Sequence, residues 1–360
     1  MMVFQMMLRD SSQASKRCCI TGNISLEYHW NITGFPLTIP LTIPLTVKPC
    51  VAPSSCTQYD PTSTSITSQI SVSRYPFMKI SNQTEELEQT LKALDTCPMR
   101  VLVPTMGCLH QGHIELIHRA RQLAGQDGSV ILSVFVNPTQ FDKAEDLENY
   151  PRSLERDLSL CREHGVDIVY APAPAAMYHP DHSITVSESA LSSQLCGATR
   201  PGHFDGVCTV VLKLINLTQP AIAVFGKKDY QQLAVIRRMV RDLNVPVKIE
   251  GVDTIREKSG LALSSRNERL SPAQHADAAR IRRALLAARK AHQQGEVSAQ
   301  TLLGIARTEI EASEVGAVID YLELLDSQTL QHIDRVNSAA VMATAVFYGK
   351  VRLIDNIELA

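Results

Sequence analysis

From Met78 onward, short apolar segments alternate with amphipathic helical stretches. Glycine, proline or asparagine flanks the segments expected to be strands, which are residues 101–103, 130–136, 168–170, 221–225 and 247–252. Between them, apolar residues recur at intervals of three and four, as in helices packed on a sheet, over residues 115–123, 154–163 and 230–243. This alternation predicts an α/β fold, a Rossmann-like doubly wound parallel sheet with crossover helices.

The pattern changes after about Gly260. A charged, alanine-rich helical stretch covers residues 272–293, and a further helix and short strands at 321–324, 341–348 and 351–354 follow it. We expect a smaller α+β domain that closes over the first one. The predicted division is 78–254 for the Rossmann-like domain and 255–360 for the C-terminal lid domain.

The first 77 residues are rich in Ser and Thr, poor in acids, and contain the internal repeat LTIPLTIPLT. Prolines at positions 36, 40, 44, 49 and 53 block helix formation and most sheet pairing, and the polar stretch 54–73 has little to bury. We expect a disordered extension. Two alternatives stay open: an organellar targeting segment, or an upstream sequence that is never translated, with the true start at Met78.

Composition favours small-molecule chemistry. Of the 360 residues 44% are apolar, and a net charge of -2 with 20% charged residues gives no basic face for nucleic acid. No apolar run reaches the roughly 18 residues that span a bilayer. The nine cysteines show no CxxC pair and no metal-ligand spacing, which fits reduced thiols in a cytoplasmic protein and predicts no metal held by the protein itself.

The first expected strand leads into PTMGCLHQGHIELIHRA, where Gly107 and Gly112 permit a tight backbone and a helix is expected near His113. A helix N-terminus presents unpaired N–H groups and the positive end of the helix dipole, so it favours phosphate. His110 and His113 flank Gly112 and would project toward the same point. There, two N–H donors could stabilise charge that develops on the α-phosphate of a nucleotide.

Polar side chains follow the second strand and precede a later apolar helix. Asn137 and Gln140, in FVNPTQF, stand at the carboxyl edge of the sheet and could bind a small polar acid, although Asn-Pro is also an ordinary turn. In RPGHFDGV, Arg200, His203 and Asp205 share a glycine-bearing loop. Arg200 could pair with a carboxylate or phosphate, although a loop arginine is as often a solvated surface residue.

Two later segments repeat the combination of loop and cation. In FGKKDYQQL, Lys228 is a candidate clamp for phosphate oxygens, with Asp229 and Gln232 placed to meet nucleotide or substrate. In LALSSRN, a polar loop at the junction of the two domains offers two hydroxyls and a guanidinium, a set that can bind triphosphate. Alone, the SSR sequence would also fit a helix cap or a linker.

Six segments together resemble the pantothenate synthetase (pantoate–β-alanine ligase) family, in order and spacing: PTMGCLHQGH, FVNPTQF, YPRSLERD, RPGHFDGV, FGKKDYQQL and LALSSRN. The resemblance covers nearly all of residues 78–360. HxGH is shared with nucleotidylyltransferases and class I aminoacyl-tRNA synthetases, so it indicates the superfamily and the other segments indicate the family. The first 77 residues have no counterpart in typical bacterial members.

The resemblance implies a ligase of pantothenate biosynthesis, on the route to coenzyme A. Such an enzyme condenses (R)-pantoate with β-alanine to pantothenate through a pantoyl-adenylate, and releases AMP and pyrophosphate. ATP with Mg²⁺ and a homodimer are implied as well.

Residue roles follow from the same resemblance. His113 would be the family's acid and His110 its companion on the phosphates. The residues implied in catalysis are His113, His110, Lys228, Ser264, Ser265 and Arg266. The residues implied in ATP binding are Met106, Gly107, Cys108, Leu109, His110, Gln111, Gly112, His113, Gly226, Lys227, Lys228, Asp229, Leu263, Ser264, Ser265 and Arg266, with the backbone of Ile255 at the adenine.

Gln140 and Gln232 would hold pantoate, with Gln140 also near β-alanine, and Asn137 and Arg200 complete the predicted substrate pocket. The sequence departs from the family pattern at Cys196, where many relatives carry glutamate, which weakens any acidic role there. Lys227 also replaces a frequent glutamate. We expect its side chain to point to solvent.

Two other classes of function compete with the ligase. A nucleotidylyltransferase would share HxGH and the loop of Arg266 but would release a stable nucleotide product; the amides of Asn137 and Gln140 and the added C-terminal domain argue against it. A catalytically idle binding protein on the same fold is the third class, and the presence of every phosphate-facing residue argues against that.

Overall fold

The computed structural model describes residues 21–32, 35–46, 78–93, 99–142 and 144–359. The chain forms two compact units, Met1–Ser68 and Gln69–Ala360. In the first unit, β1 (Thr21–Ile32) pairs antiparallel with β2 (Phe35–Thr46) along the full length of both strands. This hairpin differs from the expected absence of regular structure. The rest of the expected extension lies outside the described residues.

The prolines of β2 explain how the repeat can pair. Pro36, Pro40 and Pro44 are four residues apart, so their missing N–H groups all lie along the same edge of the strand. Among the described residues β2 is paired with β1 alone, so that edge can be the unpaired one, where proline removes no ladder hydrogen bond. The expectation treated the prolines as if they blocked both edges.

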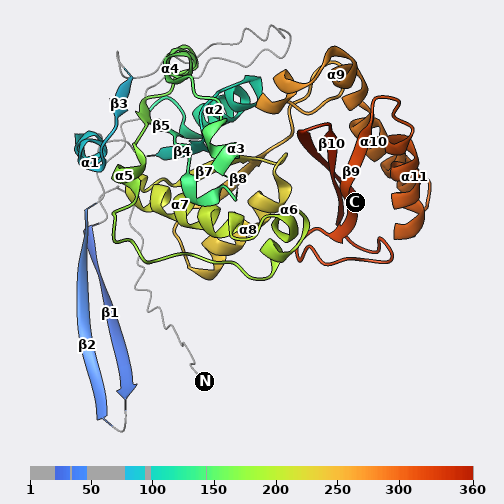
Figure 1. Cartoon of the computed structure of the whole chain (residues 1–360). Helices are drawn as coiled ribbons and strands as arrows, with labels where there is room; N and C mark the ends of the chain where they lie inside the picture. The colour runs from blue at the N-terminus through green and yellow to red at the C-terminus, as the bar shows by residue number, and fades with distance from the viewer. Residues whose placement is uncertain (1–20, 33–34, 47–77, 94–98, 143, 360) are drawn as a thin grey trace, which may run out of the picture. The chain divides into compact units, whose positions relative to one another are not determined.

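Six parallel strands form the main sheet of the second unit, in the order β3-β6-β5-β4-β7-β8 (Figure 1). Their bounds are β3 Lys79–Ser81, β4 Arg100–Thr105, β5 Ser129–Val134, β6 Ile168–Tyr170, β7 Ile222–Gly226 and β8 Lys248–Val252. The chain runs from β4 through β5 to β6 and then returns to β7 on the other side of β4. The predicted doubly wound sheet is confirmed. Its order reverses between β4 and β7, the switch point at which such sheets bind ligands.

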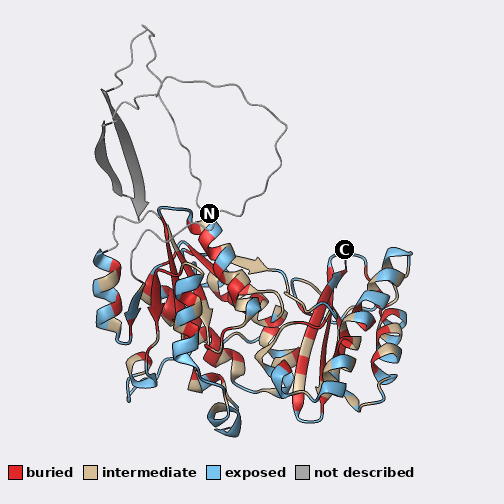
Figure 2. Ribbon diagram, turned by 90° about the horizontal axis from the view of Figure 1, so that it is seen from above, coloured by how far each residue is buried: buried red, intermediate tan, exposed pale blue. Residues whose placement is uncertain are grey.

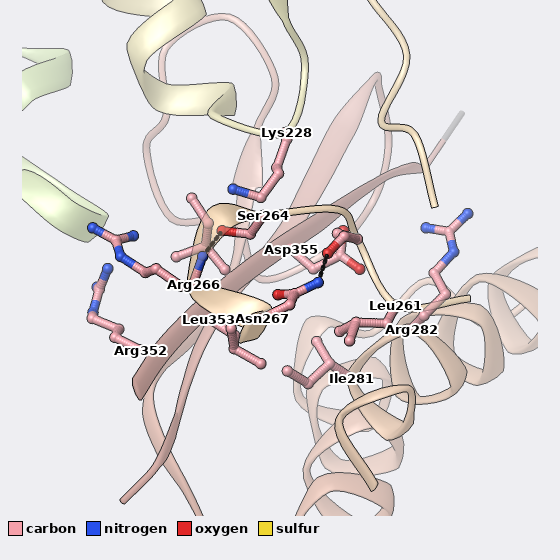
Figure 3. Close-up of a pocket in the computed structure, with 12 residues that line it drawn as sticks. Lys228, Leu261, Ser264, Arg266, Asn267, Ile281, Arg282, Arg352, Leu353 and Asp355 are labelled. Atoms are coloured by element: carbon pink, nitrogen blue, oxygen red, sulfur yellow. Dashed lines mark hydrogen bonds between the residues drawn. The ribbon is translucent and has the colours of Figure 1, made fainter. Parts of the chain in front are cut away.

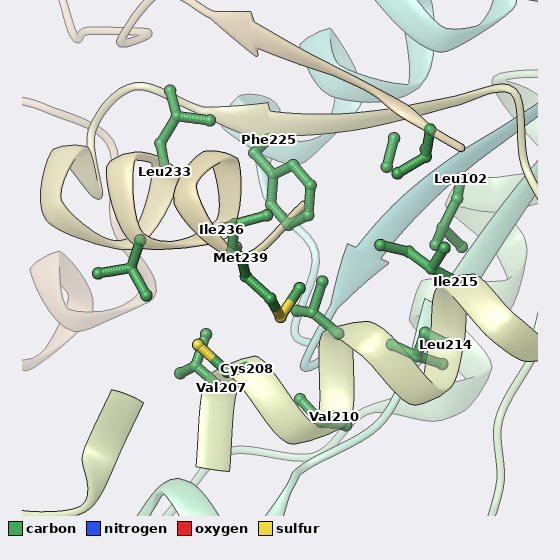
Figure 4. Packing of buried hydrophobic residues seen from close by; sticks show 14 of the residues in the cluster. Leu102, Val207, Cys208, Val210, Leu214, Ile215, Phe225, Leu233, Ile236 and Met239 are labelled. Atoms are coloured by element: carbon green, nitrogen blue, oxygen red, sulfur yellow. The ribbon is translucent and has the colours of Figure 1, made fainter. Parts of the chain in front are cut away.

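Helices cover both faces of this sheet. Along β4, Val101 and Val103 face α2 (Gln111–Ala124) and α4 (Leu154–Glu163), whereas Leu102 faces α7 (His203–Thr218) and α8 (Tyr230–Asp242), as the two-residue period of a strand requires (Figure 4). The four central strands, β6, β5, β4 and β7, are therefore buried on both sides, whereas the edge strands β3 and β8 are partly exposed (Figure 2). The shorter helices are α1 Thr84–Ala93, η1 Pro138–Gln140, α3 Ala144–Glu148, α5 Pro174–Met177, η2 Leu191–Ser193 and α6 Leu195–Thr199.

The C-terminal part has a three-stranded antiparallel sheet in the order β11-β10-β9. Its elements are η3 Ser265–Arg269, α9 Pro272–Ala278, α10 Arg280–Gln293, α11 Ala299–Glu311, β9 Ala317–Asp326, β10 Ala340–Tyr348 and β11 Val351–Leu359. One face of the sheet packs against α10 and α11. From the other face Leu325, Val341 and Ala343 join the core around α7 and α8. The two sheets fall on either side of the predicted boundary after residue 254, but because they share a core, that boundary stays a prediction.

Candidate active site

The junction between β4 and α2 carries two histidines whose rings lie against each other. His110 is the N-cap of α2, and its Nδ1 accepts the backbone N–H of Gly112 at 3.1 Å. The Nδ1 of His113 accepts the backbone N–H of His110 at 3.2 Å, and the ring centroids are 4.1 Å apart. Because Nδ1 is an acceptor in both rings, each neutral imidazole carries its proton on Nε2. Each ring therefore keeps one N–H donor for a ligand.

The reciprocal capping also sets where the helix begins. We expected α2 to begin near His113, but it begins at Gln111, because the side chain of His110 takes the place of the usual Ser or Asp cap. Gly112 makes room for this arrangement. A Cβ at position 112 would lie 2.9 Å from Cε1 and 3.0 Å from Nδ1 of His110, so any larger residue would displace the ring.

Both imidazoles are held in the neutral form. Burial lowers the pKa of His113 to about 3, and the neighbouring His110 and Lys228 add to this effect. Burial also lowers the pKa of His110, and the charge of Lys228 is the next cause. Asp229 acts in the opposite direction on both rings. Lys228 and Asp229 therefore lie within electrostatic reach of both histidines.

Asp157 of α4 holds the loop that precedes the histidines, and the sequence analysis missed it. Its carboxylate is buried and accepts the backbone N–H groups of Cys108 at 2.8 Å and Leu109 at 2.7 Å. Gly107 adopts a positive φ of 80°, and a Cβ there would lie 2.9 Å from Oδ2 of Asp157. The backbone N–H groups of positions 108, 109 and 112 already have acceptors. A phosphate would therefore accept hydrogen bonds from the imidazole Nε2–H groups more readily than from these backbone groups.

The turn between β7 and α8 presents Lys228, and α8 begins after its N-cap Asp229. Lys228 makes no ion pair with a carboxylate among the described side chains, so its charge is available to a ligand. Lys227, expected to point to solvent, has a side chain that is 32% exposed and that pairs with an 85% exposed acid. Its Nζ lies 2.7 Å from Oδ1 of Asp253, and this hydrogen bond raises the pKa of Lys227.

The loop from Leu263 to Arg266 lies between two cavities. Ser264 is the N-cap of η3 and its Oγ accepts the backbone N–H of Arg266, so the helix-cap alternative describes one part of its role. One pocket brings Lys228, Ser264 and Arg266 together (Figure 3). The other, a cavity of about 570 Å³, is lined by His110, Ser264 and Ser265. Ser264 borders both, so it lies between the pocket of Lys228 and Arg266 and the cavity of His110.

The predicted substrate amides contact the loop between β4 and α2 through Met106. Gln140 is 8% exposed; its Oε1 accepts from Asn137 at 3.1 Å and its Nε2 contacts Sδ of Met106 at 3.0 Å. Asn137 is 1% exposed and also donates to the carbonyl of Gly206, while its Oδ1 accepts from Tyr178 at 2.9 Å. With its hydrogen-bonding groups used in this way, Asn137 fixes the orientation of Gln140.

Arg200 lies in a network that already contains an acid. Its Nε lies 3.1 Å from Oδ1 of Asp142, and one terminal nitrogen donates to the backbone carbonyl of Gln140. His203 also binds that carbonyl through Nδ1 at 2.8 Å. Burial, followed by the charge of Arg200, lowers the pKa of His203 to about 4. A ligand anion would therefore have to share Arg200 with Asp142.

The remaining predicted residues are placed less directly. The backbone carbonyl of Ile255 accepts the N–H of Leu263 at 2.9 Å, which joins the two nucleotide-side segments. Gln232 is partly buried. Its neighbour Gln231 accepts the backbone N–H of Cys196 in α6 at 3.0 Å and donates to the carbonyl of Leu191 in η2 at 2.8 Å. Cys196, in the place of the family's glutamate, contacts the hydroxyl of Tyr321 at 3.4 Å.

Tyr150 is a second residue that the sequence analysis missed. Burial raises its pKa to about 12, and Arg266, Cys108 and Asp229 act on it through their charges. Its ring stacks edge-on with Phe141 at a centroid distance of 5.7 Å. Tyr150 therefore lies within electrostatic reach of Arg266, Cys108 and Asp229. It belongs to the quoted YPRSLERD segment, and that segment was the available signal.

The fold and the site together define a class of enzyme: a Rossmann-like nucleotide-binding enzyme of the HxGH superfamily, with its histidine pair at the switch point of the sheet. None of the described helices has the length and apolar character needed to cross a membrane. Within this class, residues 79–358 match the family model for pantoate–β-alanine ligase. The chain belongs to that family of ATP-binding ligases.

Similar proteins agree with this assignment. A pantothenate synthetase of Akkermansia muciniphila is 56% identical over 259 residues, which cover 72% of this chain and 92% of that protein. The crystal structure of pantothenate synthetase from Thermus thermophilus matches with a TM-score of 0.73 and 43% identity, over 78% of this chain and 99% of the other. A pantoate–β-alanine ligase from Francisella tularensis, complexed with β-γ ATP and β-alanine, has a TM-score of 0.64 and 32% identity, over 78% and 97% of the two chains.

Proposed function

We propose that this enzyme condenses (R)-pantoate with β-alanine through a pantoyl-adenylate. The carboxylate of pantoate attacks the α-phosphate of ATP, and pyrophosphate leaves. The amine of β-alanine then attacks the acyl carbon, forms the amide bond of pantothenate and releases AMP. The observation that carries this proposal is the pair of neutral histidines with free Nε2–H donors beside Lys228, which bears no ion pair among the described side chains.

The residues would act by positioning and by stabilising charge. As the α-phosphate becomes five-coordinate, negative charge grows on its oxygens and on the departing pyrophosphate. The Nε2–H groups of His110 and His113, the ammonium of Lys228 and the loop Ser264–Ser265–Arg266 can donate to these oxygens. Gln140 and Gln232 would hold pantoate so that its carboxylate lies in line with the leaving group.

Magnesium would enter with ATP as part of the substrate. Among the described residues, no group of three or more His, Cys, Asp or Glu side chains could hold a metal ion. Mg²⁺ keeps several waters and is commonly held by substrate phosphates with one or two protein carboxylates, so a single carboxylate near the triphosphate would be enough. Asp229 is a carboxylate within electrostatic reach of both histidines, and Glu268 reaches His110 as well. The role of Asp229 would be to orient the metal that neutralises the phosphates.

Exchange of labelled pyrophosphate into ATP tests the adenylate directly. We expect exchange that requires pantoate and Mg²⁺ but not β-alanine, because only the first step has to run forward and back. Analysis of the complete reaction should give AMP and pantothenate in equal amounts. Active enzyme that makes pantothenate without any pantoate-dependent exchange would rule out a reversible adenylate, and a persistent nucleotide conjugate would favour the transferase. The homodimer and the cytoplasmic location stay predictions.

A further inference from the structure

A residue of the C-terminal sheet forms two hydrogen bonds with the turn that carries Lys228. Asn356 lies in β11, and its Nδ2 donates to the backbone carbonyls of Lys227 and Lys228, each at 3.0 Å. The amide nitrogen has two hydrogens, so both of its donors are used on consecutive carbonyls. These carbonyls fall between the end of β7 and the start of α8, where neither the sheet nor the helix supplies a partner.

Asp355, the residue before Asn356, stabilises the turn that leads into the Ser264–Arg266 loop. Asp355 is 4% exposed, and its carboxylate forms a two-bond pair with Arg256, at 2.7 Å and 2.8 Å. Arg256 also donates to the carbonyl of Gly260 and bridges to Ala262, so it holds the turn that leads into Ser264. One Oδ of Asp355 accepts the backbone N–H of Asn356 at 2.8 Å, which couples the two side chains.

Two adjacent positions of one strand therefore hold two segments that are far apart in sequence. Neighbouring residues of a strand point to opposite faces, so Asp355 and Asn356 can reach different segments from one rigid backbone. Asn356 is 9% exposed and its strand pairs with β10 along its whole length, so neither residue is free to move. The separation between Lys228 and the Ser264 loop is thus fixed by β11.

We propose that Asn356, supported by Asp355 and Arg256, is a positioning residue that sets Lys228 against the Ser264–Arg266 loop for adenylate formation. This inference rests on the proposed function. Asn356 acts through the backbone of the turn and does not touch the phosphates. Loss of its two donors would let the turn shift, and a displacement of about 1 Å at a reacting group can cost about a hundredfold in rate.

The test uses the full chain with Asn356→Asp, which puts a carboxylate opposite two carbonyls, and Asn356→Ala, which removes the amide without adding charge. We expect pantoate-dependent pyrophosphate exchange to fall by about tenfold to a hundredfold in kcat, with the KM for pantoate within about twofold of wild type. Asn216→Asp, the same change at an exposed position of α7, should leave exchange unchanged.

A double-mutant cycle separates positioning from a merely structural role. If Asn356 acts through Lys228, Asn356→Ala should cost little further exchange activity when Lys228→Ala is already present. Additive losses, or exchange within about threefold of wild type in both single variants, would overturn the inference. Failure of both variants to fold would overturn it as well, because Asn356 would then be a structural residue. Absence of exchange in the wild-type enzyme would instead count against the proposed adenylate.

Discussion

The two sides of the switch point are built in different ways. After β4, the histidine pair is held within one short segment, where His110 and Gly112 are two residues apart and His113 bonds back to His110. After β7, the turn of Lys228 is held by Asn356, more than a hundred residues away in the sequence. The donors of the first side are fixed by local geometry, and the cation of the second side depends on the C-terminal sheet.

Removal of a single donor on the local side should have the largest effect. His113→Ala deletes an Nε2–H donor that we place on the α-phosphate, so turnover should fall by about a hundredfold to a thousandfold. Steady-state kinetics and pyrophosphate exchange would measure the loss, and a circular dichroism spectrum would check the fold. His118→Ala, an exposed histidine of the same helix, is the matched control. Unchanged turnover in His113→Ala would remove the assigned role.

On the remote side, stability should change as well. Arg256→Gln leaves the carboxylate of Asp355, which is 4% exposed, without its partner, so the free energy of unfolding should fall by about 3 kcal/mol. Arg307→Gln breaks an exposed pair with Glu311 in α11 and should cost less than about 1 kcal/mol. Urea unfolding of both variants measures the difference. Equal small losses would mean that β11 does not anchor the loop as strongly as its contacts indicate.

Acid should lower the free energy of unfolding through His113, by less than the loss expected for Arg256→Gln. The pKa of His113 is about 3 in the folded protein and about 6.5 when unfolded, so the unfolded chain binds more protons between these values. The stability that the neutral His113 contributes is therefore fully present above pH 6.5 and is lost as the pH falls toward 3. For His113 alone the loss at pH 5 should be about 2 kcal/mol relative to pH 8.

The free energies of unfolding of wild type and His113→Asn, each measured at pH 5 and at pH 8, isolate the contribution of His113. The variant should lose correspondingly less stability on acidification, because its amide does not titrate. The charges of Lys228 and Asp229 and the ring of His110 are present in both proteins and cancel in the comparison. The same pH dependence in both proteins would show that His113 is not held neutral by the fold.

The contrast between the two sides also explains how far the sequence could predict the structure. The parallel sheet, its main helices and the HxGH and GKKD segments follow from periodicity and local motifs, since strand alternation and helix caps are short-range effects. The capping by His110, the positive φ of Gly107 and the carboxylate of Asp157 depend on side chains that meet only after folding. Asp157 ends the quoted YPRSLERD segment, so the family resemblance was the available signal, whereas helical periodicity alone does not distinguish it from an ordinary helix acid.

The role of Asn356 was still less accessible. In the sequence it lies two residues beyond the strand expected at 351–354, but β11 extends to Leu359 and its packing against the β7–α8 turn buries Asn356. The hairpin of β1 and β2 was missed for a different reason. The number of prolines in the repeat argued against pairing, but the prolines share one edge of the strand and the other edge can pair.

A crystal structure of the enzyme with Mg²⁺, pantoate and a non-hydrolysable ATP analogue tests the central claim most directly. We predict that the triphosphate lies within hydrogen-bond distance of Nε2 of His110 or His113, Nζ of Lys228 and the Ser264–Arg266 loop, all on the same nucleotide. A nucleotide that contacts the histidines while Lys228 faces a separate cavity would contradict the account.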